Sequence, residues 1–183
     1  MAGVLLDYEC LRDHRVRPLA VLNDSKQLDP ARREELFRAV LRCAARVSVR
    51  VVPHSQIDRD GLHRSNLRGL REVLADLCPP AEVCLVDGFR LGPAAPRHTA
   101  VVDGDEQSAA IAAASIVAKV TRDRAMRRID ALYPQYGFAS HVGYITPAHS
   151  AVVRRRGPCP VHRLSFQALC YGVGDAALLE DDR

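Results

Sequence analysis

The chain has 183 residues, 48% of them hydrophobic, and carries 26 Lys and Arg against 22 Asp and Glu. This length suits one domain with a proper core, and the hydrophobic share together with a net charge of only +4 excludes a disordered chain. No apolar run approaches the roughly 20 residues of a membrane-spanning helix, and the apolar stretch Ala2–Leu6 is too short, with no basic lead-in, for a secretory signal.

The first part of the chain predicts a strand, a helix and a second strand. Val4–Leu6 and Val47–Val52 have the apolar or alternating patterns of strands. Between them, Asp29 and Pro30 are typical of a helix start, as an N-cap followed by a first-turn proline. We expect the apolar face of this helix to consist of Leu36, Phe37, Val40 and Leu41.

The middle of the chain predicts strands alternating with helices. A second helix is expected from Gln56 to Leu77, with a glycine inside it, and Glu82–Val86 reads as a short buried strand. Thr99–Val102 is a further strand candidate. The Ala-rich segment from Ser108 to about Leu132 predicts a long helix that Pro134 ends. This alternation favours an α/β domain.

Cysteine and arginine usage gives weaker signals. The six cysteines include no C-x-x-C pair, so we expect reduced thiols and a cytoplasmic protein rather than a disulfide framework or a zinc knuckle. Of the 26 cations, all but Lys26 and Lys119 are arginine. The planar guanidinium suits phosphate groups, although genomic base composition explains the bias equally well. A pI near 8.9 permits a polyanionic partner without requiring one.

Two aspartates follow neighbouring predicted strands. Asp87 comes directly after Glu82–Val86, and Asp105 lies between Val101–Val102 and the long helix. Open α/β sheets bind ligands at the carboxyl ends of their strands, and two converging carboxylates suit a hard cation such as Mg²⁺ or Mn²⁺. The simpler alternative is that Asp87 belongs to a turn and Asp105 caps a helix.

A longer pattern bears on that choice. The segment Gly104–Asp123 (GDEQSAAIAAASIVAKVTRD) resembles the signature of the ribonuclease HII family. Further segments resemble the same family in the same order: Asp24–Leu28, Val86–Gly88, Tyr133–Phe138 continuing into His141–His149, and Gly157–Phe166. The resemblance extends from about Val4 to Phe166, and AAASIVAKVTRD is its most specific part.

The resemblance implies an endonuclease that cuts the RNA strand of RNA–DNA hybrids and nicks 5′ of single ribonucleotides embedded in DNA. It implies a ribonuclease H-like fold, a mixed sheet flanked by helices with a small helical C-terminal part. The family's site is a D-E-D-D set of carboxylates holding two Mn²⁺ or Mg²⁺ ions, which activate water and stabilise the leaving oxygen. Asp87 matches the third carboxylate and Asp105 the fourth. Tyr144 matches the tyrosine that stacks on the sugar at the RNA–DNA junction, while Ser25 and Lys26 match a segment lying against the nucleic-acid backbone.

These implications define the expected organisation. We expect a single domain over residues 1–183, with a ribonuclease H-like core over about 1–135 and a substrate-contacting part over about 136–172. Residues 173–183, which end acidic, are expected to fray. The expected protein is a cytoplasmic monomer that acts on RNA–DNA hybrids or on ribonucleotide-containing DNA and has no membrane partner.

One family motif has no counterpart in the sequence. The first two carboxylates come from a D-E-x-G-R-G strand and loop, whereas Ala2–Leu6 resembles the strand that follows it. Asp7 and Glu9 lie after that strand and do not replace the pair. We therefore expect the first strand to be missing, either because Met1 is an internal codon of a longer protein or because the protein is truncated. We favour the first explanation. A truncated protein would be a non-catalytic, hybrid-binding remnant or a poorly folded fragment.

Other polar residues have structural interpretations. We expect His141, His149 and His162 to be structural, since their spacings fit no zinc pattern, and Tyr133 and Tyr136 to pack at the end of the long helix. Asp123 is expected to pair with a neighbouring arginine, and Lys119 to lie on a packed or solvated helix face. Arg122, Arg124, Arg127 and Arg128 predict a solvated side of the helix. Contact with nucleic acid and simple solvation are equally favoured for Arg154–Arg156 with Arg163.

Overall fold

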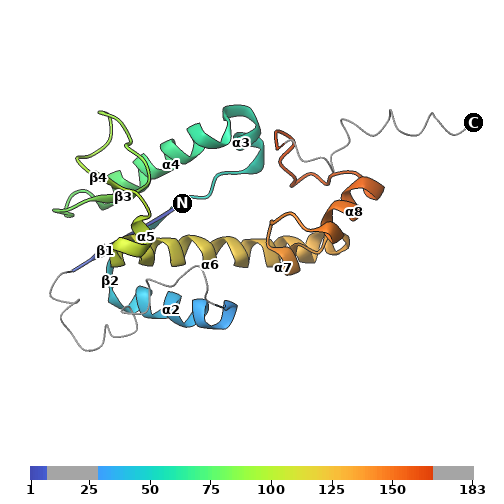
Figure 1. The fold of residues 1–183 in the computed structure, drawn as a ribbon, viewed down its shortest axis with the longest axis horizontal. Coiled ribbons are helices and arrows are strands. Elements are labelled where there is room, and N and C mark those ends of the chain that lie inside the picture. Colours follow the sequence, from blue (N-terminus) through green and yellow to red (C-terminus); the bar gives the residue numbers. More distant parts are fainter. Residues whose placement is uncertain (8–28, 167–183) are drawn as a thin grey trace, which may run out of the picture. The chain divides into compact units, whose positions relative to one another are not determined.

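The computed structural model describes residues 1–7 and 29–166 as helices joined to short strands (Figure 1). The elements in chain order are β1 (Ala2–Leu6), α2 (Pro30–Cys43), β2 (Ala44–Val49), α3 (His54–Asp60), α4 (Leu62–Leu77), β3 (Leu85–Asp87), β4 (Thr99–Val101), α5 (Gly104–Gln107), α6 (Ala109–Leu132), the 3₁₀ helix η2 (Pro134–Tyr136), α7 (Phe138–His141) and α8 (Pro147–Arg156). The predicted α/β class is confirmed. None of the described helices combines the length and apolar composition needed to cross a bilayer.

Contacts within the chain define two compact units. Of the described residues, unit 1 comprises 1–7, 29–52 and 63–121, and unit 2 comprises 53–62 and 122–166. The long helix α6 contributes its first half to unit 1 and its second half to unit 2. The expected division near residue 135 stays a prediction.

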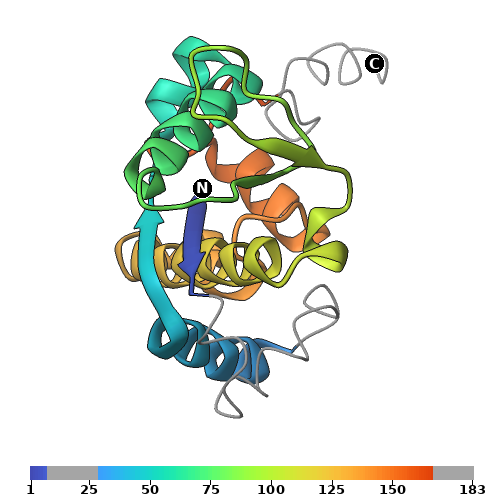
Figure 2. The ribbon, with the colours of Figure 1, turned by 90° about the vertical axis from the view of Figure 1, so that its left-hand side faces the viewer.

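The first core of unit 1 lies between the β1–β2 pair and two helices. β1 and β2 are antiparallel, with Ala2 opposite Val49 and Leu5 opposite Arg46, and Figure 2 shows them side by side with opposed directions. Their buried neighbours are aliphatic or aromatic side chains of α2 and α6: Leu36, Phe37, Ala39, Val40, Ala112, Ala113, Ile116, Val117 and Val120. Burial of this apolar surface stabilises unit 1.

The start of α2 follows its sequence signals. The Asp29 side chain accepts a hydrogen bond of 2.8 Å from the Arg32 backbone N–H, and Pro30 opens the first turn. The helix start is therefore confirmed. The expectation for Leu41 is wrong, because its side chain is 47% exposed. The buried arc centres on Leu36 and Val40, and a step of about 100° per residue carries Leu41 beyond its edge.

The expected helix from Gln56 to Leu77 is wrong as a single element. It is divided into α3 and α4 at Gly61, whose φ of +83° lies outside the helical region. Glycine adopts this conformation without steric cost and ends α3 there. The two pieces belong to different units, because α3 lies in unit 2 and residues from His63 onward lie in unit 1.

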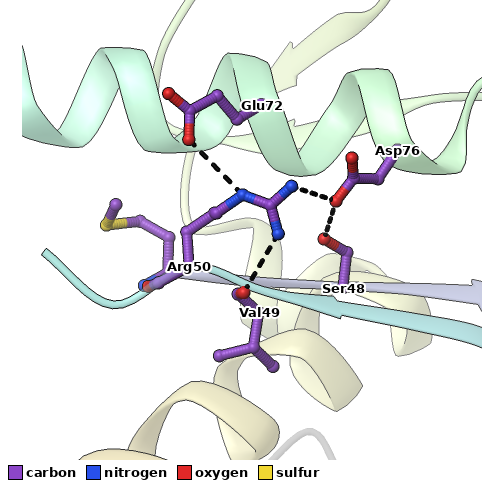
Figure 3. Close-up of polar contacts among 6 residues, drawn as sticks. Ser48, Val49, Arg50, Glu72 and Asp76 are labelled. Atoms are coloured by element: carbon purple, nitrogen blue, oxygen red, sulfur yellow. Dashed lines mark hydrogen bonds and ion pairs between the residues drawn. The ribbon is translucent and has the colours of Figure 1, made fainter.

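A polar network joins α4 to β2 within unit 1 (Figure 3). The Arg50 guanidinium forms ion pairs with Asp76, at 2.6 Å, and with Glu72, at 3.4 Å. The Ser48 hydroxyl donates a 2.6 Å hydrogen bond to the same Asp76 carboxylate. This hydrogen bond, followed by the Arg50 charge, lowers the pKa of Asp76 below its usual value.

The second strand pair positions the first predicted site residue. β3 and β4 are parallel, with Leu85 opposite Thr99 and Asp87 opposite Val101. β3 is shorter than expected and ends one residue later, at Asp87. Val86 packs with Leu74 and Leu91 in a second core cluster of unit 1. In the described part of the chain, the four strands form two separate two-stranded sheets, one antiparallel and one parallel, rather than one continuous mixed sheet.

Unit 2 has an aromatic core. Tyr136, Phe138, Val153 and Cys159 are buried together, and Tyr133 packs against them from the end of α6, which confirms the packing predicted for both tyrosines. α6 ends at Leu132, before Pro134, as expected. α8 begins with a Thr146 cap, whose hydroxyl accepts a 3.2 Å hydrogen bond from the His149 backbone N–H.

Candidate functional site

Asp87 and Asp105 both lie near the carboxyl end of the β3–β4 pair. Asp87 is the exposed last residue of β3, whereas Asp105 lies in the first turn of α5 and is only 8% exposed. The Gly104 backbone N–H donates a 3.0 Å hydrogen bond to Oδ1 of Asp87. This bond places the backbone next to Asp105 directly against the Asp87 carboxylate.

Gly104 makes this close approach available. A Cβ atom at this position would lie 2.5 Å from Cδ1 of Ile111 and 3.2 Å from Oδ1 of Asp87. A side chain at position 104 would therefore require the end of the Ile111 side chain to move and would crowd the Asp87 carboxylate. The absence of a side chain, rather than backbone freedom, explains the glycine here, since only the close approach requires it.

The two carboxylates have the chemistry of a ligand pair for a hard cation. Carboxylate oxygens are preferred by Mg²⁺ and Mn²⁺, and Mg²⁺ is commonly held by one or two carboxylates, with water and substrate phosphates as its other ligands. Asp87 and Asp105 fit that pattern. Among residues 1–7 and 29–166, no three His, Cys, Asp or Glu side chains form a group that could hold a metal ion.

Tyr144 lies on the surface of unit 2, with 58% of its side chain exposed. The chain reaches it through two successive left-handed residues, Val142 at φ +41° and Gly143 at φ +86°. A β-branched residue rarely adopts this conformation, so the surrounding structure must hold it there. The Tyr144 backbone N–H closes the turn with a 2.8 Å hydrogen bond to the His141 carbonyl.

Two side chains that the sequence did not connect with Tyr144 support this turn. Nδ1 of the buried His141 accepts a 3.1 Å hydrogen bond from the Gly143 N–H, while its Nε2 lies 3.0 Å from the Tyr136 carbonyl. The Arg122 guanidinium lies 4.6 Å from the centre of the Tyr144 ring, in a cation–π contact. Arg122 also pairs with Asp123 at 3.5 Å, which confirms the predicted arginine partner of Asp123.

The three histidine rings lie close together in unit 2, and the structural role predicted for them stays a prediction. The His149 ring lies 4.3 Å from the His141 ring and 5.3 Å from the His162 ring, measured between centroids. Burial lowers the pKa of both His149 and His162, an effect that the other histidines reinforce. The neutral forms of His149 and His162 are therefore favoured in the folded chain.

The arginines of α6 and α8 for which the sequence predicted contact with solvent or nucleic acid are exposed in the structure. Arg154–Arg156 end α8 and are exposed, as are Arg122, Arg124, Arg127 and Arg128 on α6. The segment after α8 is joined to α3, because Asp58 accepts hydrogen bonds of 2.9 and 3.0 Å from the backbone N–H groups of Leu164 and Ser165. No sequence signal pointed to this contact. Ser25 and Lys26 lie outside the described residues.

Comparison with known proteins places the chain in a family. The family model described as Ribonuclease HII matches residues 4–169. The chain belongs to the ribonuclease HII family. A ribonuclease HII of Mycobacterium bovis is 45% identical over 166 residues, which are 90% of this chain and 63% of that protein. A ribonuclease HII of Salinispora tropica is 48% identical over 145 residues, 79% of this chain and 54% of that protein. The chain thus spans somewhat less than two thirds of these relatives.

Solved structures of the family share the fold. Ribonuclease H2 of Pyrococcus horikoshii OT3 matches with a TM-score of 0.73 and 24% identity, over 88% of this chain and 83% of its own. Ribonuclease HII of Archaeoglobus fulgidus, solved in complex with PCNA, matches with a TM-score of 0.74 and 24% identity, over 96% and 90%. These likenesses confirm the predicted ribonuclease H-like fold.

Proposed function

We propose that the chain belongs to an endoribonuclease that cleaves the RNA strand of RNA–DNA hybrids and nicks 5′ of ribonucleotides embedded in DNA. The observation that carries the proposal is the contact between Asp87 and the backbone of Gly104, which places the residue before Asp105 against the Asp87 carboxylate at the ends of neighbouring strands. The match to the ribonuclease HII family over residues 4–169 supports it. A monomer in the cytoplasm is part of the same proposal.

In this proposal, Asp87 and Asp105 are catalytic residues that hold Mn²⁺ or Mg²⁺. Two such ions supply an activated water and offset the charge on the leaving 3′ oxygen. The contribution of the chain is the placement of its carboxylates: the Gly104 N–H orients the Asp87 group, and the first turn of α5 fixes Asp105. The proposed two-metal site needs more donors than this pair.

Unit 2 would bind the nucleic acid. An exposed aromatic ring stacks on sugars and bases, and arginines contact phosphates. Tyr144 offers such a ring, fixed by the turn at Val142 and by Arg122. Ser25 and Lys26 are proposed as further contacts to the backbone of the substrate.

A nicking assay tests the proposal. Its substrate is a DNA duplex with one ribonucleotide, beside an all-DNA duplex, and the proteins are this chain and a version extended upstream in frame. We expect the extended version to cleave 5′ of the ribonucleotide, with a dependence on Mn²⁺ or Mg²⁺ and no cleavage of the all-DNA duplex. Asp105→Asn should lower the rate about 100-fold or more, because it removes one anionic ligand.

Asp103→Asn is the matched control. Asp103 is exposed, two positions from Asp105, and its φ of +49° is one that asparagine adopts readily. This variant should keep full activity. Nicking that survives Asp105→Asn would overturn the assignment. Tight binding of the ribonucleotide-containing duplex without nicking by either version would replace the proposal with a non-catalytic, hybrid-binding protein.

A further inference from the structure

The strongest feature outside the proposed site is a pair of thiols at the base of β3. Cys78 follows the last residue of α4, and Cys84 immediately precedes β3. Both are free, half-buried thiols whose Sγ atoms are 2.7 Å apart. At this separation the two thiols are in direct contact, with either one able to donate a hydrogen bond to the other.

The backbone on both sides holds the sulfurs in place. The Cys78 N–H donates to the Leu74 carbonyl at 3.0 Å, which continues the last turn of α4. The Cys84 carbonyl accepts a 2.9 Å hydrogen bond from the Thr99 N–H, which extends the β3–β4 pairing. Both side chains also pack against the core cluster of Leu74, Val86 and Leu91. The two thiols are therefore brought together by the fold as well as by their closeness in sequence.

A metal site explains the pair less well than covalent chemistry. Soft metals bound by thiolates commonly need three or four ligands. No group of three suitable side chains exists in the described part of the chain, and this pair has no third partner of that kind. Two adjacent thiols without further ligands suit a reaction that involves the two sulfurs alone.

We propose that Cys78 and Cys84 form a reversible disulfide when the protein meets a low-molecular-weight disulfide such as oxidised glutathione. The Cys78 thiolate attacks the oxidant, which forms a mixed disulfide and releases one thiol. The Cys84 thiolate then attacks the Cys78 sulfur and expels the second thiol. Two electrons and two protons leave the pair, and the oxidant is reduced to two thiols.

The surroundings of Cys84 favour this order of attack. Burial, with the neighbouring Cys78 as a second cause, raises the pKa of Cys84 to about 11. A thiol with so high a pKa is a poor first nucleophile. Once Cys78 is part of a mixed disulfide it carries no charge, so its share of this increase disappears before the second step.

Peptide mass mapping tests the proposal on the full chain. The protein is equilibrated in glutathione redox buffers, quenched with acid, alkylated and digested with trypsin. The tryptic peptide Glu72–Arg90 contains both thiols and no other cysteine. In oxidising buffer it should carry no alkyl group and be lighter than the free dithiol peptide by two hydrogen atoms, and dithiothreitol added before alkylation should restore the alkylated form. Cleavage after Glu82 should leave the two halves linked.

The contribution of the fold is measured by repeating the equilibration in denaturant. The constant for disulfide formation should be about tenfold or more larger in the folded chain, because the structure holds the sulfurs together. Folding and disulfide formation are linked in one thermodynamic cycle, so a disulfide that forms more readily in the folded chain also stabilises that fold. The oxidised chain should therefore melt a few degrees higher than the reduced chain. Cys43→Ser should behave like the parent, whereas Cys84→Ser should stop at the mixed disulfide on Cys78.

Two results would overturn the proposal. One is a Glu72–Arg90 peptide that keeps both alkyl groups, or carries stable glutathione, in buffers that oxidise the pair in denaturant. The other is equal constants for the folded and the unfolded chain. Far-UV circular dichroism establishes that each serine variant is folded. The constants for disulfide formation with and without denaturant are compared on the parent chain, so this comparison does not depend on the folding of any variant.

Discussion

The two units of this chain have different interiors. The first core of unit 1 is mainly aliphatic, with Leu36, Val40 and Ile116 almost fully buried. Unit 2 buries rings instead, with Tyr136 and Phe138 in contact with three imidazoles. Aliphatic packing does not depend on pH near neutrality, whereas an interior containing imidazoles does. The units should therefore respond differently to the same change of conditions.

The proposed functions are divided between the same two units. Unit 1 presents carboxylates at the end of a strand pair, and unit 2 presents an exposed tyrosine with several exposed arginines. Carboxylates bind cations, and arginines with an exposed ring bind nucleic acid. Each difference can be tested with substitutions that affect one unit.

The largest expected effect on stability comes from the interior of unit 1. Ile116→Ala should lower the free energy of unfolding by about 2–5 kcal/mol, because it leaves a cavity in a fully buried site. Urea unfolding followed by circular dichroism measures the loss. Ile145→Ala is the matched control: Ile145 is 61% exposed, so the same change should cost less than about 0.5 kcal/mol. Similar losses for the two variants would contradict the described core.

The next effect concerns binding by unit 2. Tyr144→Ala should weaken binding to a ribonucleotide-containing duplex by about 1–3 kcal/mol, roughly 5- to 150-fold, through loss of the stacking ring. Tyr144→Phe keeps the ring and its contact with Arg122, so its affinity should stay near that of the parent. Fluorescence anisotropy in Ca²⁺ measures both. Equal affinities for Tyr144→Ala and the parent would show that unit 2 binds in another way.

The smallest expected effect is a difference between the two units in how their stability changes with pH. Burial places the folded-state pKa values of His149 and His162 below the unfolded value of about 6.5. The unfolded state therefore takes up protons first as the pH falls, so unit 2 loses stability below about pH 6.5 and keeps it above that pH.

Hydrogen exchange, corrected for the intrinsic effect of pH on the exchange rate, measures this difference. Between about pH 7.5 and pH 5.5, α8 in unit 2 should lose more protection than α2 in unit 1. Replacing the exposed His63 of unit 1 with glutamine should leave the difference unchanged. Equal losses of protection in α2 and α8 would contradict the contrast between the interiors.

Local sequence signals predicted much of the fold. The cap at Asp29, the long helix before Pro134 and the strands that lead to Asp87 and Asp105 all depend on neighbouring residues. The continuous helix across Gly61 was wrong because a glycine in a helical pattern can also be a break, and the left-handed φ that decided it is a property of the fold. The two-strand pairs also needed the structure, since strand pairing joins distant segments.

The surroundings of the site were less predictable. The contact between Arg122 and Tyr144 joins a helix to a later turn. The hydrogen bonds from Leu164 and Ser165 to Asp58 connect residues 106 and 107 positions apart. No short pattern encodes such contacts, because they depend on how the chain returns to an earlier element. The proximity of Cys78 and Cys84 in space likewise became evident only from the backbone that holds them.

The claim that unit 1 supplies the chemistry and unit 2 the binding is tested most directly by single-turnover nicking with Asp87→Asn. The protein, in the version extended upstream in frame, is in saturating excess over a duplex with one ribonucleotide, with Mn²⁺ present, and its affinity is measured in parallel. The account predicts a rate about 100-fold or more below that of the parent protein and a Kd within about threefold of the parent value. An unchanged rate, or a loss explained entirely by weaker binding, would contradict it.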